Sequence, residues 1–238
     1  FNPVHTPADT VQFKNKNVVV LILESFGKEY VGSLNKTLEG GHYKGYTPFL
    51  DSLIQKSLYF DYSFANGRTS IDGMPSSLSS IPMFVEKFLL TPAALNSLTS
   101  VAGELHKKGY YTAFFHGAAN GSMGFQAFSR SAGYQDYYGR TEYNNDEDFD
   151  GNWAIWDEEF LQFFANKMAT FKQPFCTGIF TASSHHPYNI PERYKDVYKE
   201  SSLPIHKCIR YSDHALQRFF ETASKEVRCP GKIFLLCC

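Results

Sequence analysis

The sequence lacks the signals of several protein classes. Its longest clean apolar run is Val18–Leu23, whereas a membrane-spanning helix needs about 20 apolar residues. No charged and then apolar segment follows Phe1, so no signal peptide is expected. The 23 basic and 24 acidic residues nearly cancel, so no basic excess points to nucleic acid. The first residue is not Met, which suggests a fragment or processed product whose upstream membrane anchor is missing.

Cysteine is also scarce. The five cysteines are an odd number and include no C-x-x-C pair, so neither a disulfide framework nor a zinc ribbon is expected. They are predicted to be isolated thiols. Hydrophobic residues make up 43% of the chain and aromatic residues 16%, which is enough for a packed core.

Segments of strand character alternate with segments of helical spacing. Strands are predicted at 18–23, 58–64, 110–115, 175–181 and 233–236. Helices are predicted at 47–57, from the turn at 66–67 to residue 80, and at 96–108, 123–132, 156–171 and 204–223. This alternation predicts an α/β fold with a mostly parallel sheet and helices on both faces. No linker or repeat divides the chain, so residues 1–238 are predicted to form one domain.

Polar side chains follow three of the predicted strands. They are Glu24–Ser25, His116 and the pair His185–His186. In parallel sheets the chemistry lies just past the carboxyl ends of the strands, so these groups are candidate site residues. Glu24 has two interpretations, a ligand for a divalent metal or a solvated strand end. Each histidine suits charge neutralisation or proton transfer at a phosphate, or else ordinary surface or packing roles.

The segment Arg68–Gly73 offers two hydroxyl groups at a predicted helix start. Backbone N–H groups there attract anions, and a metal ion would activate Thr69 or Ser70 as a nucleophile. An ordinary helix cap is the alternative. Two further groups are expected to be structural: the tryptophans Trp153 and Trp156 in core packing, and the acidic run 146–150 as a solvated loop rather than a calcium site.

Taken in order, these motifs resemble lipoteichoic acid synthase-like proteins, in the sulfatase branch of the alkaline phosphatase superfamily. The matching segments are VVVLILESF (18–26), RTSIDGM with LSSIP (68–82), FHG (115–117), SHHPY (184–188) and YSDHALQRFF (211–220). The resemblance implies an alkaline phosphatase-like fold on the extracytoplasmic face of a bacterial envelope. It also implies transfer of phosphoglycerol or phosphoethanolamine, or hydrolysis of phosphate or sulfate esters, with phospholipid head groups or such esters as substrates.

By the same resemblance, Glu24 and the nucleophile hold a divalent ion, expected to be Mn²⁺, with Zn²⁺, Mg²⁺ or Ca²⁺ as alternatives. Matching Ile71–Gly73 and the following LSSIP places the nucleophile at Ser70, whereas matching only Gly67–Arg68 places it at Thr69; Ser70 is favoured. His185 is implied as a catalytic residue on the substrate side. Substrate binding is assigned to a set of three residues: Arg68, His116 and His186.

The sequence departs from the family at two places. Formylglycine sulfatases need Pro or Ala two residues after the nucleophile and Arg four after it, but Asp72 and Met74 follow Ser70, so an aldehyde nucleophile is not expected. Relatives also continue past the last strand into a metal-binding Asp-His pair, where this chain has Cys237–Cys238. A truncation or frame change near residue 226 would explain this. The chain alone is therefore expected to bind metal weakly and to be nearly inactive; a non-catalytic binding or structural remnant is the alternative.

Overall fold

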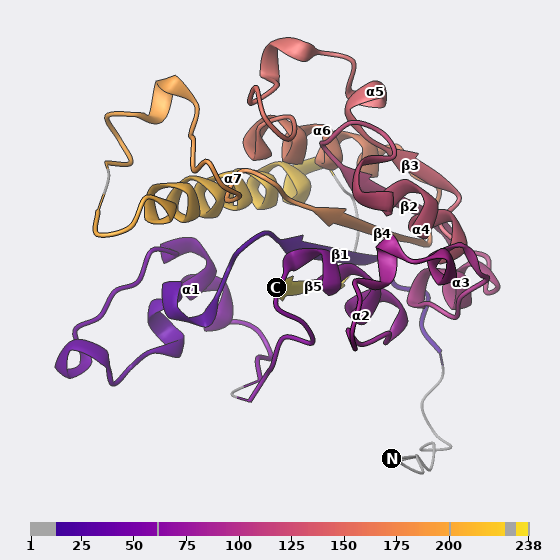
Figure 1. Cartoon of the computed structure of the whole chain (residues 1–238), viewed down its shortest axis with the longest axis horizontal. Helices are drawn as coiled ribbons and strands as arrows, with labels where there is room; N and C mark the ends of the chain where they lie inside the picture. Colours follow the sequence, from indigo (N-terminus) through magenta and orange to yellow (C-terminus); the bar gives the residue numbers. More distant parts are fainter. Residues whose placement is uncertain (1–12, 61, 200, 227–231, 238) are drawn as a thin grey trace.

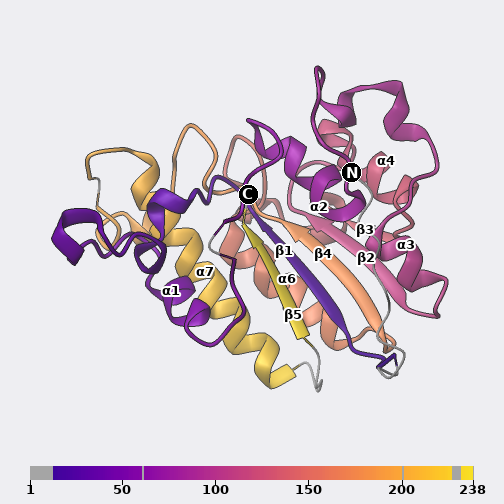
Figure 2. The same ribbon diagram turned by 90° about the horizontal axis from the view of Figure 1, so that it is seen from below.

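Five parallel strands form the centre of the molecule (Figures 1 and 2). The computed structural model describes residues 13–60, 62–199, 201–226 and 232–237. The strands are β1 Val18–Leu23, β2 Tyr111–His116, β3 Asp136–Tyr138, β4 Phe175–Phe180 and β5 Lys232–Cys237. Their spatial order is β3-β2-β4-β1-β5, and every neighbouring pair is parallel. This confirms the predicted parallel α/β architecture.

Helices fill the connections between these strands. The α-helices are α1 Pro48–Ile54, α2 Gly73–Ser79, α3 Val101–His106, α4 Phe125–Ser131, α5 Arg140–Tyr143, α6 Asp157–Ala169 and α7 Ile205–Glu226. Short 3₁₀ helices include η4 Ser70–Asp72, directly before α2, and η9 Glu192–Tyr194. No helix within the described ranges combines the length and apolar character needed to cross a bilayer.

Three local predictions were wrong. Residues 58–60 and 62–64 form no strand, and Leu58 and Phe60 are largely exposed, because this segment pairs with no neighbouring strand. The helix predicted at 96–108 begins only at Val101, since the Ser100 hydroxyl accepts a hydrogen bond from the Gly103 N–H and caps the helix there. Strand β3 was not predicted because three residues are too few for a visible alternation. Residues 1–12 of the predicted lead-in, Cys229 and Cys238 lie outside the described residues.

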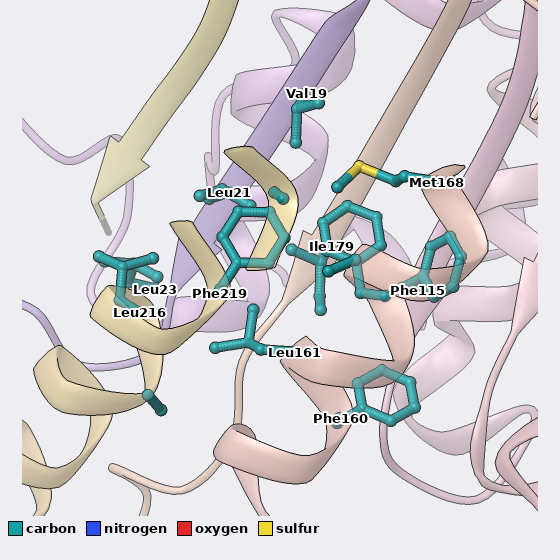
Figure 3. Packing of buried hydrophobic residues seen from close by; sticks show 14 of the residues in the cluster. Val19, Leu21, Leu23, Phe115, Phe160, Leu161, Met168, Ile179, Leu216 and Phe219 are labelled. Atoms are coloured by element: carbon teal, nitrogen blue, oxygen red, sulfur yellow. The ribbon is translucent and has the colours of Figure 1, made fainter. Parts of the chain in front are cut away.

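Strand β1 packs against helices on both of its faces. Its odd-numbered residues, such as Leu21 and Leu23, belong to one buried cluster with Leu161 of α6 and Phe219 of α7 (Figure 3). Its even-numbered residues join a second cluster, with residues of α2, α3 and α4. Figure 1 shows α6 and α7 on one side of the sheet and α2 and α3 on the other. The predicted coverage of both faces is therefore confirmed.

Helix α7 also anchors helix α1. The buried Asp213 carboxylate accepts hydrogen bonds from the N–H groups of Phe49 and Leu50, each at 2.9 Å. These N–H groups lie in the first turn of α1, where a helix has no internal acceptors for them. Burial is the main cause that raises the pKa of Asp213, to about 6.

This raised pKa makes a testable prediction about stability. The folded chain holds the Asp213 proton more tightly than the unfolded chain does, so this group contributes stability below about pH 4 that is lost as the pH rises through about 6. Relative to Asp213→Asn, which does not titrate, the wild type is expected to lose up to about 3 kcal/mol of unfolding free energy between pH 4 and pH 7. Urea denaturation at several pH values measures this difference. A difference that stays constant with pH would contradict the assignment.

Candidate functional site

Glu24 lies at the carboxyl end of β1, one residue past the strand. Its side chain is only 5% exposed. Val20 and Ile22 of β1 belong to the buried cluster that includes residues of α2, and continuing the two-residue period of the strand predicts the same face for Glu24, which lies in the turn that follows. Its carboxylate accepts a hydrogen bond from the Ser25 hydroxyl at 2.8 Å. None of the ion pairs among the described residues involves Glu24, so a buried carboxylate remains there without a cation.

The two candidate nucleophiles begin η4 on that same face. Ile71 and Met74, which follow them, share a buried cluster with Ile22, so this turn packs close to the end of β1. Figure 2 shows α2 beside the carboxyl ends of β1 and β4. The Thr69 hydroxyl donates to the Asp72 carboxylate at 2.9 Å, whereas the Ser70 hydroxyl has no protein partner among the described residues. Arg68, the residue that precedes Thr69, is exposed.

Gly67 allows the turn that carries Thr69 and Ser70 to fold against Asp72. The Asp72 side chain is 3% exposed and lies behind Gly67. A Cβ atom added at Gly67 would come within 2.5 Å of the Asp72 Cβ, and the residue has a φ of 156°. Glycine is therefore required at this position for the turn to approach the buried carboxylate.

His116 ends β2 inside the protein. Its ring packs against the rings of Phe125 and Phe180, which also contact each other, and its Nδ1 is 3.0 Å from the Phe180 carbonyl oxygen. Burial lowers the pKa of His116 to about 4, so the imidazole is neutral at pH 7 and its Nδ1–H donates to this carbonyl. The Nε2 atom is buried without a hydrogen-bond partner in the described structure. The predicted role of His116 in substrate binding stays a prediction, and the residue is not at the surface.

His185 and His186 follow β4 and form a small exposed cluster with Trp153. The rings of Trp153 and His185 are 4.5 Å apart between centroids, and the indole Nε1–H donates to the His186 carbonyl oxygen at 2.6 Å. The same carbonyl lies 2.9 Å from His185 Nδ1. Trp153 is 39% exposed, so its predicted place in the core was wrong. Trp156 is partly buried and meets the Tyr211 ring edge-on.

The segment that carries these histidines is fixed by residues that the sequence did not indicate. The buried Asp157 carboxylate accepts hydrogen bonds from the Ala182 N–H and the Ser212 hydroxyl. The Thr181 hydroxyl accepts one from the Glu24 N–H at 2.9 Å. A buried Asp at a helix start is indistinguishable from a surface helix cap in sequence, so no pattern identified this network.

The described residues contain no group of three or more His, Cys, Asp or Glu side chains placed to hold an ion. Glu24 and Ser70 carry a carboxylate and a hydroxyl, both oxygen ligands of the kind that divalent ions accept, and their role as metal ligands stays a prediction. Strand β5 runs parallel to β1 with Cys237 in register with Leu23, so its carboxyl end meets the same edge of the sheet. In the acidic run 146–150, Asp146 is exposed and pairs with Arg140, as expected of a solvated loop.

Comparison with known proteins shows which family the chain belongs to. A family model described as Sulfatase matches residues 16–229. The chain belongs to the sulfatase family. It is 26% identical over 221 residues to the lipoteichoic acid synthase-like protein YvgJ of Bacillus subtilis, a match that covers 90% of this chain.

Solved structures agree with this family. An alkaline phosphatase superfamily protein from Vibrio parahaemolyticus superposes with a TM-score of 0.81 and 28% identity, covering 96% of this sulfatase-family chain and 55% of that one. The C-terminal periplasmic domain of EcEptC from Escherichia coli, in complex with Zn, has a TM-score of 0.61 at 14% identity, covering 94% and 64% of the two chains, and shows the fold alone. The chain spans about a third of the curated relatives' length, 35% for YvgJ.

Proposed function

We propose that this chain is part of the catalytic domain of a metal-dependent phosphoryl-group transferase or hydrolase that works through a covalent intermediate on Ser70. The observation that carries the proposal is the buried Glu24 carboxylate, which has no ion pair among the described residues and follows a strand whose Ile22 shares a buried cluster with Ile71, the neighbour of Ser70. Membership of the sulfatase family supports ester chemistry at this edge of the sheet. The proposed substrates are phospholipid head groups, such as phosphoglycerol or phosphoethanolamine, or phosphate or sulfate esters.

Ser70 is the proposed nucleophile, and its hydroxyl has no partner within the part of the chain that the structure describes. In the first step its Oγ attacks the phosphorus, a new O–P bond forms and the bond to the leaving alcohol breaks. The Ser70 proton passes to solvent, and His185 gives a proton to the leaving oxygen. In the second step an acceptor alcohol or water attacks the phosphoserine and gives its proton to His185, while the O–P bond to Ser70 breaks and the Ser70 oxygen takes a proton from solvent. The order of events is ping-pong. His116, His186 and Arg68 are proposed to contact the substrate.

The proposed metal ion would be held by Glu24 and Ser70, together with groups beyond the described set. It would supply positive charge that lowers the pKa of the serine hydroxyl and stabilises the phosphate. Mn²⁺ is the proposed ion, with Zn²⁺, Mg²⁺ and Ca²⁺ to be compared with it. We propose the extracytoplasmic face of the membrane as the site of action, because the proposed substrates are envelope lipids or esters.

Trapping the covalent intermediate tests the nucleophile. A full-length version of the protein is incubated with Mn²⁺ and phosphatidylglycerol micelles, and the adduct is located by mass spectrometry of peptides. The adduct is expected on Ser70 in the wild type, is expected to be absent in Ser70→Ala, and is expected to persist in Thr69→Ala. Removing an attacking hydroxyl eliminates the covalent route, so the expected loss of transfer rate is at least about a thousandfold.

The variants Ser70→Ala and Thr69→Ala also give the results that would contradict the proposed nucleophile. Loss of the adduct in Thr69→Ala with retention in Ser70→Ala would move the nucleophile by one residue. An adduct on neither residue, with transfer still measured, would overturn the covalent route and leave direct attack by the acceptor.

A further inference from the structure

The segment after β4 is held by one buried carboxylate. Asp157 is 3% exposed at the start of α6. Its Oδ1 accepts a hydrogen bond from the Ala182 N–H at 2.8 Å, and its Oδ2 accepts one from the Ser212 hydroxyl at 2.9 Å. Its own N–H donates to the Ser183 hydroxyl at 2.9 Å. One residue therefore ties the segment after β4 to both α6 and α7.

Two candidate site residues depend on this segment. The His185 N–H donates to the Ala182 carbonyl at 3.0 Å, so the turn that presents the His185 ring begins at the residue that Asp157 holds. On the other side, the Thr181 hydroxyl accepts the Glu24 N–H, and the Thr181 N–H donates to the Ile22 carbonyl. The segment thus fixes the backbone of Glu24 as well as that of His185.

Glu158, the residue after Asp157, makes different contacts. The Glu158 carboxylate, in the same turn of α6, pairs with Arg193 and Arg218 and accepts the Tyr194 hydroxyl. It holds the region of η9 rather than residues 181–187. Asp157 and Glu158 therefore carry the same charge at the same helix start but anchor different segments.

We propose that Asp157 is a positioning residue, which sets the backbone of His185 and Glu24 relative to each other through its hydrogen bonds to Ala182 and Ser212. A buried carboxylate that satisfies a backbone N–H and a buried hydroxyl is costly to replace, because removal leaves both donors without partners. That this positioning serves catalysis rests on the proposed function. The hydrogen-bonded arrangement itself can be measured without any enzyme turnover.

Amide hydrogen exchange and NMR test the proposal on the 238-residue chain. In Asp157→Ala, the N–H groups of His185 and Glu24 are expected to exchange about 10 to 100 times faster. That acceleration is expected to exceed the one measured in the centre of β4, which reports global stability. The nuclear Overhauser contact between the Trp153 indole and the His185 ring, 4.5 Å apart in the structure, is expected to disappear.

Three further variants keep the test decisive. Asp157→Asn retains an oxygen for the Ala182 N–H and is expected to restore most of the protection at His185. Ser212→Ala removes the donor to Asp157 Oδ2 and also the 3.1 Å contact of Ser212 with the Ser184 hydroxyl, but it leaves the Ala182 hydrogen bond in place. It is expected to show a smaller acceleration and serves if Asp157→Ala does not fold. Glu158→Gln removes the neighbouring charge and is expected to leave His185 and Glu24 unchanged.

The failures of the two proposals are distinguishable. Equal acceleration of His185, Glu24 and the centre of β4 in Asp157→Ala would mean a purely global role and would overturn the positioning. Failure to detect an adduct on Ser70 would overturn the covalent mechanism and would leave these exchange results unaffected.

Discussion

Replacing Phe115 by alanine is expected to lower the free energy of unfolding by about 3–5 kcal/mol. Phe115 lies in β2 and is fully buried. Its ring contacts five others, and the shortest centroid distances are 4.5 Å to Tyr138 and 4.6 Å to Phe164. Figure 3 shows it above Phe160 on the face covered by α6. Alanine would leave a cavity that the surrounding rings cannot close, because they are held by the sheet and by α6.

Urea denaturation measures this loss, and an exposed phenylalanine supplies the control. Phe84→Ala removes the same atoms from a side chain that is 81% exposed, and its effect is expected to stay within about 0.5 kcal/mol. Phe115→Leu fills part of the cavity and is expected to lie between the two. A loss below about 1 kcal/mol in Phe115→Ala would mean that the core collapses around the missing ring, which close packing excludes.

The central strands were predictable because they are almost entirely buried. Val18–Leu23 and Phe175–Phe180 are covered on both faces, so the first is an unbroken apolar run and the second a mostly apolar one of strand length. Helix α7 was predicted within a few residues because its apolar positions recur at helical spacing over 22 residues. The segment 58–64 has the same residue types, but whether such a run is buried depends on a neighbouring strand, which the local sequence does not encode.

The candidate site was predictable only in part, for a similar reason. Glu24 stands out because a carboxylate ends an apolar strand, and His185 because it follows the next strand of the sheet. The sequence around Asp157 and Trp153 does not mark either residue in this way. Asp157 accepts a hydrogen bond from Ala182, and Trp153 contacts the histidine pair, and these partners are distant in the chain. Sequence position indicates where polar groups emerge from a sheet, whereas the groups that orient them come from elements packed across it.

The choice between Ser70 and Thr69 illustrates what geometry adds. Both residues occupy the same helix start, so spacing alone left them as alternatives. In the fold, the Thr69 hydroxyl is committed to Asp72, which is itself buried beneath Gly67. This hydrogen bond would either hold back the Thr69 hydroxyl or let Asp72 take its proton, so it distinguishes the two hydroxyls, and the choice of Ser70 stays a prediction.

The substitution Glu24→Gln is expected to abolish stabilisation of the chain by divalent metal. Ions that bind only the folded state raise its stability by about 1.4 kcal/mol at a free concentration 10 times the Kd. For a protein of this length that corresponds to a rise of about 3–6 °C in Tm. A site with one carboxylate is expected to have a Kd of about 1 mM or weaker, so Mn²⁺ is titrated by calorimetry into the millimolar range. Glutamine keeps the shape of Glu24 and removes the charge that attracts the ion.

The acidic run 146–150 supplies the control, because it is the other place where carboxylates gather. Glu147→Gln removes an exposed charge there and is expected to leave Mn²⁺ binding unchanged. Binding that survives Glu24→Gln but is lost in Glu147→Gln would move the ion to this loop. No saturable binding of Mn²⁺, Zn²⁺, Mg²⁺ or Ca²⁺ by the wild type would favour a non-catalytic protein of the same fold. Because glutamine matches Glu24 in size and lacks its charge, the difference between wild type and Glu24→Gln isolates the attraction of the carboxylate for the cation.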